Sequence, residues 1–145
     1  MAESIREQIA VDLVSTLKQI EEPKPRYVTR EPIKISELSQ AQMPALLIRT
    51  AGEDRSDQTM TGSNMTRLST IKFEIVGYTK AKPVDTAINQ MVEAIEEELD
   101  KDRTRNSTAL NTQVVLIEND NETLQPFGSF RMEVDVLYKF TRGAL

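Results

Sequence analysis

The C-terminal part of the chain carries the pattern that most constrains its fold. From Phe130 to Phe140 every second residue is apolar, and the residues between them are mostly charged. Because successive side chains of a strand point to opposite faces, this alternation predicts a strand with one face in a core and the other in a polar environment. Residues 66–78 alternate in the same way around Ile71, Phe73 and Ile75. The chain must therefore build a sheet with one apolar and one polar face.

Two other segments have the period of a helix, with apolar residues recurring every three or four positions. The first, Ile5–Ile20, starts within a capping box, Ser4–Glu7, and ends before Pro23, which cannot continue a helix. The second, Pro83–Asp100, opens with a proline, a residue suited to the first turn of a helix. Both helices should present an apolar stripe to the sheet.

Shorter apolar runs predict three further strands, at Tyr27–Arg30, Ala45–Thr50 and Val114–Ile117. The element order is therefore α-β-β-β-α-β-β. Residues 51–65 contain almost no aliphatic side chain, and we expect a long polar hairpin loop there. The short segment Glu118–Glu122 is expected to form an acidic turn.

These elements predict one α+β domain over residues 1–145, a mainly antiparallel sheet of four to five strands with two helices packed on one face. The other face of the sheet should be polar and should meet solvent, a lumen or a hydrated partner. The charged residues expected on this face are Lys72, Glu74, Arg131, Glu133, Asp135 and Lys139.

Composition excludes several kinds of chemistry. The chain has no Cys and no His, so it has no thiolate metal site, no cysteine nucleophile and no histidine base, and we expect no cofactor or metal. A net charge of -5 argues against a nucleic-acid-binding domain that works through a basic patch. The polar N-terminus and the lack of an apolar run of about 20 residues predict synthesis in a cytoplasm and no membrane partner.

Carboxylates crowd the end of the second predicted helix, where they oppose the helix dipole. Only the pair Glu97–Lys101 has the i,i+4 spacing that would relieve this crowding. The cluster is either a solvated helix end or an acidic surface that meets a partner or repels DNA. Its members are Glu93, Glu96, Glu97, Glu98 and Asp100.

In element order and size the chain resembles the tail terminator proteins of long-tailed bacteriophages, which are also called tail-completion or minor tail proteins. The resemblance covers nearly the whole chain. It rests on the helix Ile5–Ile20, which is followed at once by a strand, and on a second helix with an acidic end. Three further stretches support it. These are Pro44–Ile48, Thr70–Tyr78 and Phe130–Tyr138.

The resemblance implies a virion protein without catalytic residues, made in the host cytoplasm and located at the head–tail junction. Such proteins form a ring, usually a hexamer, on the last ring of the major tail-tube protein. The ring stops tube growth and offers a surface to the head-completion or connector proteins of the neck. Genomic DNA passes through it, and in a contractile tail the sheath is a further neighbour.

A closed ring needs two unlike complementary patches on each copy. We expect Arg55, Met60 and Met65 of the predicted loop to contact a neighbouring copy or the tube. We expect a polar or lumen-facing surface on the sheet, formed by Lys72, Glu74, Arg131, Glu133 and Asp135.

Three alternatives remain open. The chain could be another neck or baseplate adaptor of the virion, with the same fold and a different ring as partner. It could be a small cytosolic binding protein, which predicts an ordered apolar pocket. An enzyme would need two converging carboxyl groups with separated pKa values, for which Glu118 and Asp120 are candidates.

Overall fold

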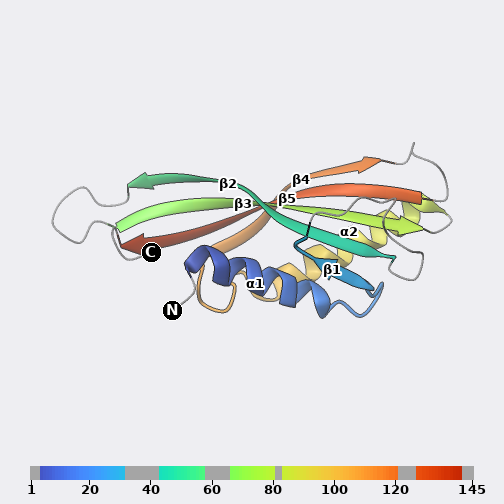
Figure 1. Ribbon diagram of the computed structural model, residues 1–145, viewed down its shortest axis with the longest axis horizontal. Helices are drawn as coiled ribbons and strands as arrows, with labels where there is room; N and C mark the ends of the chain where they lie inside the picture. Colours follow the sequence, from blue (N-terminus) through green and yellow to red (C-terminus); the bar gives the residue numbers. More distant parts are fainter. Residues whose placement is uncertain (1–3, 32–42, 58–65, 81–82, 121–126, 142–145) are drawn as a thin grey trace.

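The computed structural model describes residues 4–31, 43–57, 66–80, 83–120 and 127–141. Its elements follow the predicted order, and the α+β class is confirmed (Figure 1). They are α1 (Ile5–Lys18), β1 (Tyr27–Thr29), β2 (Ala45–Asp57), β3 (Thr66–Lys80), α2 (Val84–Asp100), β4 (Asn111–Asp120) and β5 (Phe127–Thr141).

The strands form one five-stranded sheet in the order β1-β2-β3-β5-β4. The short strand β1 pairs parallel with the start of β2, and the other neighbours pair antiparallel. The C-terminal strand β5 is therefore inserted between β3 and β4. The sheet is strongly twisted, and its strands cross in the view near the middle of the molecule (Figure 1).

Both helices lie on the same side of the sheet (Figure 1). The strand side chains that face the helices alternate with mostly charged ones, as the sequence predicts. Together with the apolar stripes of the two helices they form one large core. Fully or almost fully buried in it are Ile9, Leu13, Leu17, Ile48, Ile71, Phe73, Ile75, Ile88, Met91, Ile95, Met132, Val134, Val136 and Tyr138.

The first helix begins as predicted and ends slightly earlier. The Ser4 hydroxyl accepts a hydrogen bond of 3.2 Å from the backbone N–H of Glu7, which satisfies one free donor of the first turn. Lys18 is the last helical residue, two positions before the predicted end. Ile20 nevertheless stays buried, so its side chain belongs to the apolar stripe although its backbone has left the helix.

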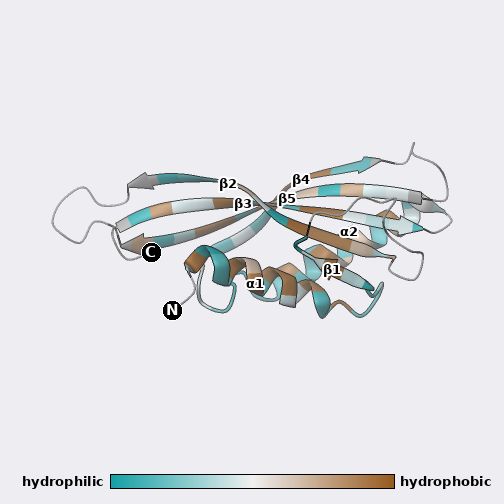
Figure 2. Cartoon of the chain, viewed as in Figure 1, coloured by the Kyte–Doolittle hydropathy of each residue, from teal (hydrophilic) through white to brown (hydrophobic). Residues whose placement is uncertain are grey.

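The predicted loop over residues 51–65 is wrong in its first half. Residues 51–57 continue strand β2 and pair with β3 as far as Asp57 opposite Arg67, after a register shift between Thr50 and Gly52. Figure 2 shows that β2 changes from hydrophobic to hydrophilic along its length. Apolar periodicity cannot reveal the second half of the strand, because its residues are mostly polar on both faces. Residues 58–65 lie outside the described part of the chain.

Strand β4 is also longer than predicted. It runs from Asn111 to Asp120, so residues 118–120 of the expected acidic turn belong to the strand and pair with β5. The polar residues at its two ends gave no apolar signal in the sequence. The rest of that turn lies outside the described residues.

The ends of the three central strands extend past the start of α1 (Figure 1). We call this part, made of Glu53–Asp57 of β2, Thr66–Thr70 of β3 and Leu137–Thr141 of β5, the arm. It places polar residues at the end of the molecule that lies beyond the start of α1 (Figure 1).

Candidate assembly surfaces

The polar face of the sheet brings the predicted charged residues together. Lys72 of β3 lies opposite Asp135 of β5, and Glu74 lies opposite Glu133. These residues alternate with the core residues of the same strands, so they share the face that the helices leave uncovered.

Arg131 is the centre of an ion-pair network on this face. Its guanidinium lies 2.9 Å from Glu133, 3.1 Å from Glu74 and 3.1 Å from Glu118 of the edge strand. Hydrogen bonds to these three carboxylates raise the pKa of Arg131 above its ordinary value. Glu74 is held from its other side by Arg49 of β2 at 2.7 Å. The network therefore crosses four strands, from β2 to β4.

A second cluster on this face surrounds Lys72, which lies 3.2 Å from Asp54 of the arm. Burial, together with the neighbouring Glu133 and Asp54 charges, raises the pKa of Asp135, although Lys72 opposes the shift. Among the described side chains the face carries five carboxylates and five cations, so it is close to neutral. The carboxylates are Asp54, Glu74, Glu118, Glu133 and Asp135, and the cations are Arg49, Lys72, Lys80, Arg131 and Lys139.

Of the predicted contact residues, Arg55 is described, whereas Met60 and Met65 lie outside the described residues. Arg55 belongs to the arm, opposite Ser69 of β3, and so lies on the helix side of the sheet. Its guanidinium stacks over the ring of Phe140, 4.7 Å from the ring centroid, and its Nε lies 2.7 Å from Glu53. This arrangement holds Arg55 against the arm, with part of its side chain still exposed.

Glu53 organises the base of the arm, and sequence reasoning missed it. Its Oε2 accepts hydrogen bonds from the Tyr138 hydroxyl at 2.7 Å and from the Ser69 hydroxyl, and its Oε1 pairs with Arg6 of α1 at 2.8 Å. Burial opposes the charge on Glu53, but the hydrogen bonds from Ser69, Tyr138 and Arg55 together hold its pKa below the ordinary value. Glu53 thus links the arm to the first helix.

The connection between α2 and β4 is held by a second buried charge, Arg105. Its side chain is fully buried, 3.3 Å from Asp12 of α1, and it donates to the backbone carbonyls of Leu99 and Asp102. Arg105 therefore caps the end of α2 while it pairs with α1. Burial lowers the pKa of Arg105, and the Asp12 charge opposes that shift. The sequence offered no signal, because Arg105 stands in a polar stretch.

The two edges of the sheet differ. On β4 three consecutive apolar side chains are exposed, Val115 by 44%, Leu116 by 36% and Ile117 by 41%. At the other edge β1 covers only the first three residues of β2, Ala45–Leu47. Among the described residues nothing pairs with the outer edge of β2 from Ile48 to Asp57.

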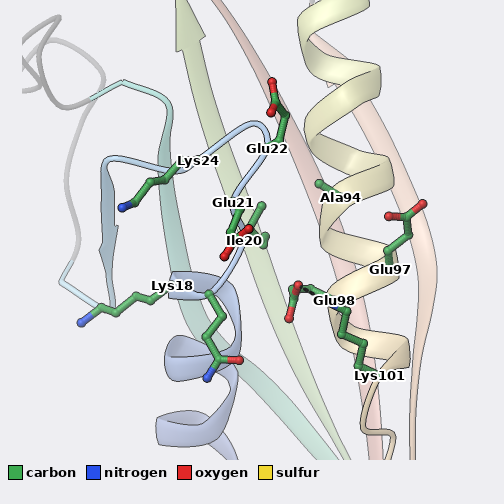
Figure 3. Close-up of a pocket in the computed structure, with 10 residues that line it drawn as sticks. Lys18, Ile20, Glu21, Glu22, Lys24, Ala94, Glu97, Glu98 and Lys101 are labelled. Atoms are coloured by element: carbon green, nitrogen blue, oxygen red, sulfur yellow. Dashed lines mark hydrogen bonds and ion pairs between the residues drawn. The ribbon is translucent and has the colours of Figure 1, made fainter.

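A groove of about 710 Å³ lies between the end of α1, the segment that follows it and the end of α2 (Figure 3). Glu98 points toward the α1 side and Glu97 points away from it (Figure 3). Lys101 pairs with Glu98 at 2.7 Å, so the predicted relief of the acidic cluster by Glu97 is wrong. Most residues that line the groove are charged, unlike the apolar pocket expected of a small-ligand-binding protein. They are Lys18, Gln19, Ile20, Glu21, Glu22, Lys24, Ala94, Glu97, Glu98 and Lys101.

The candidate carboxylate pair of an enzyme is placed only in part. Glu118 lies on the edge strand, where its side chain is 57% exposed and is paired with Arg131. Asp120 is the last residue of β4, and its side chain lies outside the described part of the chain. Across the described residues no group of three or more carboxylates could hold a metal ion, and neither helix is long and apolar enough to cross a membrane.

No family model matches the chain, and no curated protein matches it. Among solved structures, a chain from the virion of a native gene transfer agent (GTA) particle is similar over 94% of this chain and 92% of that chain. The TM-score is 0.42 and the sequence identity is 10%. A likeness of that size does not by itself assign an activity or a partner.

Proposed function

We propose that this protein is a structural component of a phage-like virion. It forms a ring, hexameric in the family that its sequence resembles, at the head-proximal end of a tail tube. There it stops tube growth and offers a docking surface to the head-completion or connector proteins of the neck. Genomic DNA only passes through the ring.

The observation that carries this proposal is the uncovered polar face of the sheet. Both helices pack on the opposite face, so the charged face is available to line a channel in a ring of copies. Arg49, Lys72 and Arg131 each lie beside at least one carboxylate of the same face. Cations that are paired in this way attract DNA phosphates less than a basic patch does, which suits passage without binding.

The arm supports the same proposal. A ring on a tube needs contacts to a neighbouring copy and to the tube, and these contacts must come from different patches. The arm extends past the helices and carries charged and polar side chains on both of its faces, Arg55 and Glu53 on one and Asp54 and Lys72 next to it on the other. It is the part of the described molecule best placed to reach a second protein.

The proposal is tested by the mass of the purified protein, measured by light scattering across concentration and with the cognate tail-tube protein added. We expect a ring, or a monomer that closes into a ring on tube ends and stops their growth. A protein that binds no tube and leaves its growth unchanged would exclude the tail role. Binding to a different ring of the virion instead would indicate the neck or baseplate adaptor.

The predicted contacts of Met60 and Met65 are tested by replacing residues 58–65 with a short turn that joins Asp57 to Thr66. The paired strands of the arm should keep the domain folded, as judged by an unchanged thermal midpoint, whereas ring or tube binding should be lost. The control replaces residues 121–126, which join β4 to β5, with a short turn. Equal assembly by both variants would argue against residues 58–65 as a contact.

The polar face is tested by charge reversal. The double variant Glu133→Lys, Asp135→Lys should still assemble but should reduce DNA delivery, because it turns a near-neutral face strongly basic. The control is Glu93→Lys, Glu97→Lys, which makes the same charge change on the exposed side of α2. If both variants deliver DNA as the wild type does, this face does not line the DNA path.

A further inference from the structure

The exposed apolar side chains of β4 lie on an edge strand, where backbone N–H and C=O groups are also available for pairing. Val115, Leu116 and Ile117 are each more than a third exposed, and nothing among the described residues pairs with the outer side of β4. Edge strands are normally blunted by charges, prolines, β-bulges or covering elements, because they pair readily with other strands. β4 has a register shift between Val114 and Leu116, but the three apolar side chains at this point stay exposed. This exposed apolar run on an open edge points to a strand partner.

The opposite edge of the same sheet offers a strand of matching length. β4 has 10 residues, and the open part of β2, from Ile48 to Asp57, also has 10. The two edge segments also lie at the same position along the strand direction. Through the shared pairings with β3 and β5, Leu116 lies at the level of Glu74, and Arg49 lies at that level on the other edge.

We infer that β4 of one copy pairs antiparallel with the open part of β2 of the next copy, so that the sheets of neighbouring subunits are continuous around the ring. This junction rests on the proposed ring and specifies its contact. Within one sheet β4 runs antiparallel to β2. A rotation that relates neighbouring copies about an axis parallel to the strands leaves every strand direction unchanged. The junction between β4 of one copy and β2 of the next is therefore antiparallel as well.

Charge complementarity favours a stagger of two residues at this junction. Such a stagger places Glu118 opposite Arg49 of the next copy and Leu116 opposite Ala51. Both strands carry a register shift inside this junction, at Ala51 of β2 and at Val115 of β4. Outside these two positions an even shift keeps side chains on their own faces, whereas a shift of one residue would turn core residues outward. Strands of closed sheets are staggered as a rule. The junction continues the polar face from one copy to the next and leaves the helices on the other side.

Pairing of β4 with β4 of a second copy is the rival arrangement. It would bury the same apolar side chains in a two-fold dimer, but it would leave the open edge of β2 unused and could not continue around a ring. The two arrangements differ in which residues come within reach of a disulfide. Since the chain has no cysteine, introduced cysteines report on them without background.

The test is oxidative cross-linking of full-length cysteine variants. Leu116→Cys combined with Ala51→Cys, or with Arg49→Cys for an unstaggered junction, should give a ladder of covalent oligomers. Each single variant should give none. The control Leu116→Cys with Ser15→Cys, which places the second thiol on the exposed side of α1, should also give no ladder. Dimers from Leu116→Cys alone would show β4–β4 pairing and overturn the inference.

A second test needs no cross-link. Val115→Lys should raise the concentration at which half of the chains assemble by at least about tenfold, because it puts a charge into the strand junction. Val11→Lys is the matched control, since Val11 on α1 is 45% exposed and Val115 is 44% exposed. Equal assembly of both variants overturns the junction.

The outcomes separate this inference from the proposed function. A ring that caps tubes but gives no β4–β2 cross-link overturns the junction alone. A β4–β2 ladder without tube capping supports the junction and removes the tail role. A chain that stays monomeric at every concentration and on tube ends overturns both.

Discussion

Arg105 shows how much of the fold depends on one side chain. Its guanidinium is fully buried and donates to carbonyls at the end of α2, and it is paired with Asp12 of α1. It therefore joins two helices and the following connection, whose residues Arg105 to Ser107 all have a positive φ. Residues other than glycine adopt that conformation only at a cost, so the contacts of Arg105 must offset it.

Arg105→Ala should lower the free energy of unfolding by about 3 kcal/mol, because it leaves Asp12 and the helix carbonyls without their partner. Arg103→Ala is the control. Its guanidinium is exposed and lies 3.9 Å from Asp100, so its loss should change stability by less than about 0.5 kcal/mol. Urea denaturation of both variants measures the difference, and similar midpoints would contradict the structural role of Arg105.

Glu53 should make stability depend on acidic pH. Its pKa is lowered in the folded protein from an ordinary value of 4.5. The stability that its charge contributes is therefore fully present above pH 4.5, and it is lost as the pH falls through the lower folded-state pKa. We expect Glu53→Gln to lose about 2 kcal/mol at pH 7 and to show a flatter decline below pH 4.5.

Thermal unfolding between pH 3 and pH 7 checks this expectation. Asp54→Asn is the neighbouring control, because the Asp54 side chain is 78% exposed and pairs with Lys72 at the surface. Exposed pairs of this kind contribute little, so this variant should follow the wild-type curve at neutral pH within about 0.5 kcal/mol. An identical pH profile for Glu53→Gln and the wild type would contradict the role given to Glu53.

At the scale of single residues the sequence revealed the polar alternation but neither the role of Glu53 nor that of Arg105. Lys72, Glu74, Arg131, Glu133 and Asp135 lie on one face because strand periodicity fixes that outcome locally. The positions of Glu53 and Arg105 depend on partners 85 and 89 residues away in sequence, Tyr138 and Thr16. Local patterns contain no information about such partners.

At the scale of elements, the pairing of β3 with β5 depends on a close approach. Gly77 lies opposite Phe130, and a Cβ added at Gly77 would come within 2.2 Å of the Phe130 ring. Phe130 is almost fully buried, so its ring has little freedom to move aside. We expect Gly77→Ala to destabilise the protein by about 1–3 kcal/mol through overpacking.

Gly52→Ala provides the comparison, because an added Cβ at Gly52 meets nothing within 4 Å. This variant should be neutral or slightly stabilising, since alanine restricts the unfolded chain more than glycine does. Chemical denaturation distinguishes the two variants. A Gly77→Ala protein as stable as Gly52→Ala would mean that the Phe130 ring can be displaced at little cost.

The arm should open locally more often than the rest of the sheet. Residues 66–70 and 71–75 belong to the same central strand, β3, and are paired on both sides, but only the second group lies under the core. Amide hydrogens of residues 66–70 should therefore exchange at least about tenfold faster than those of residues 71–75. Exchange followed by mass spectrometry tests this, and uniform protection along β3 would contradict it.

Element types were predictable from the sequence, whereas the full extent of β2 and β4 and the strand order were not. The helices and the long alternating strands have strong periods, and each was found within a few residues of its observed range. The second half of β2 and the ends of β4 lack apolar residues and form because neighbouring strands supply partners. The insertion of β5 between β3 and β4 is set by the packing of the whole sheet.

At the scale of the whole molecule, the many surface ion pairs should contribute little to stability. Arg131 is 32% exposed and Glu118 is 57% exposed, so salt and water screen their interaction. We expect the free energy of unfolding to change by less than about 1 kcal/mol between 20 mM and 500 mM salt. A larger loss in urea titrations would show that the network on the polar face is a main source of stability.

The polarity of the arm on both faces has a consequence for timing. Side chains such as Asp54 and Arg55 are readily hydrated, so the arm does not need to be covered as soon as the chain is made. An apolar extension of the same length would bind hydrophobic surfaces nonspecifically. For the proposed ring this means that copies can stay dispersed until the tube end that they cap is available.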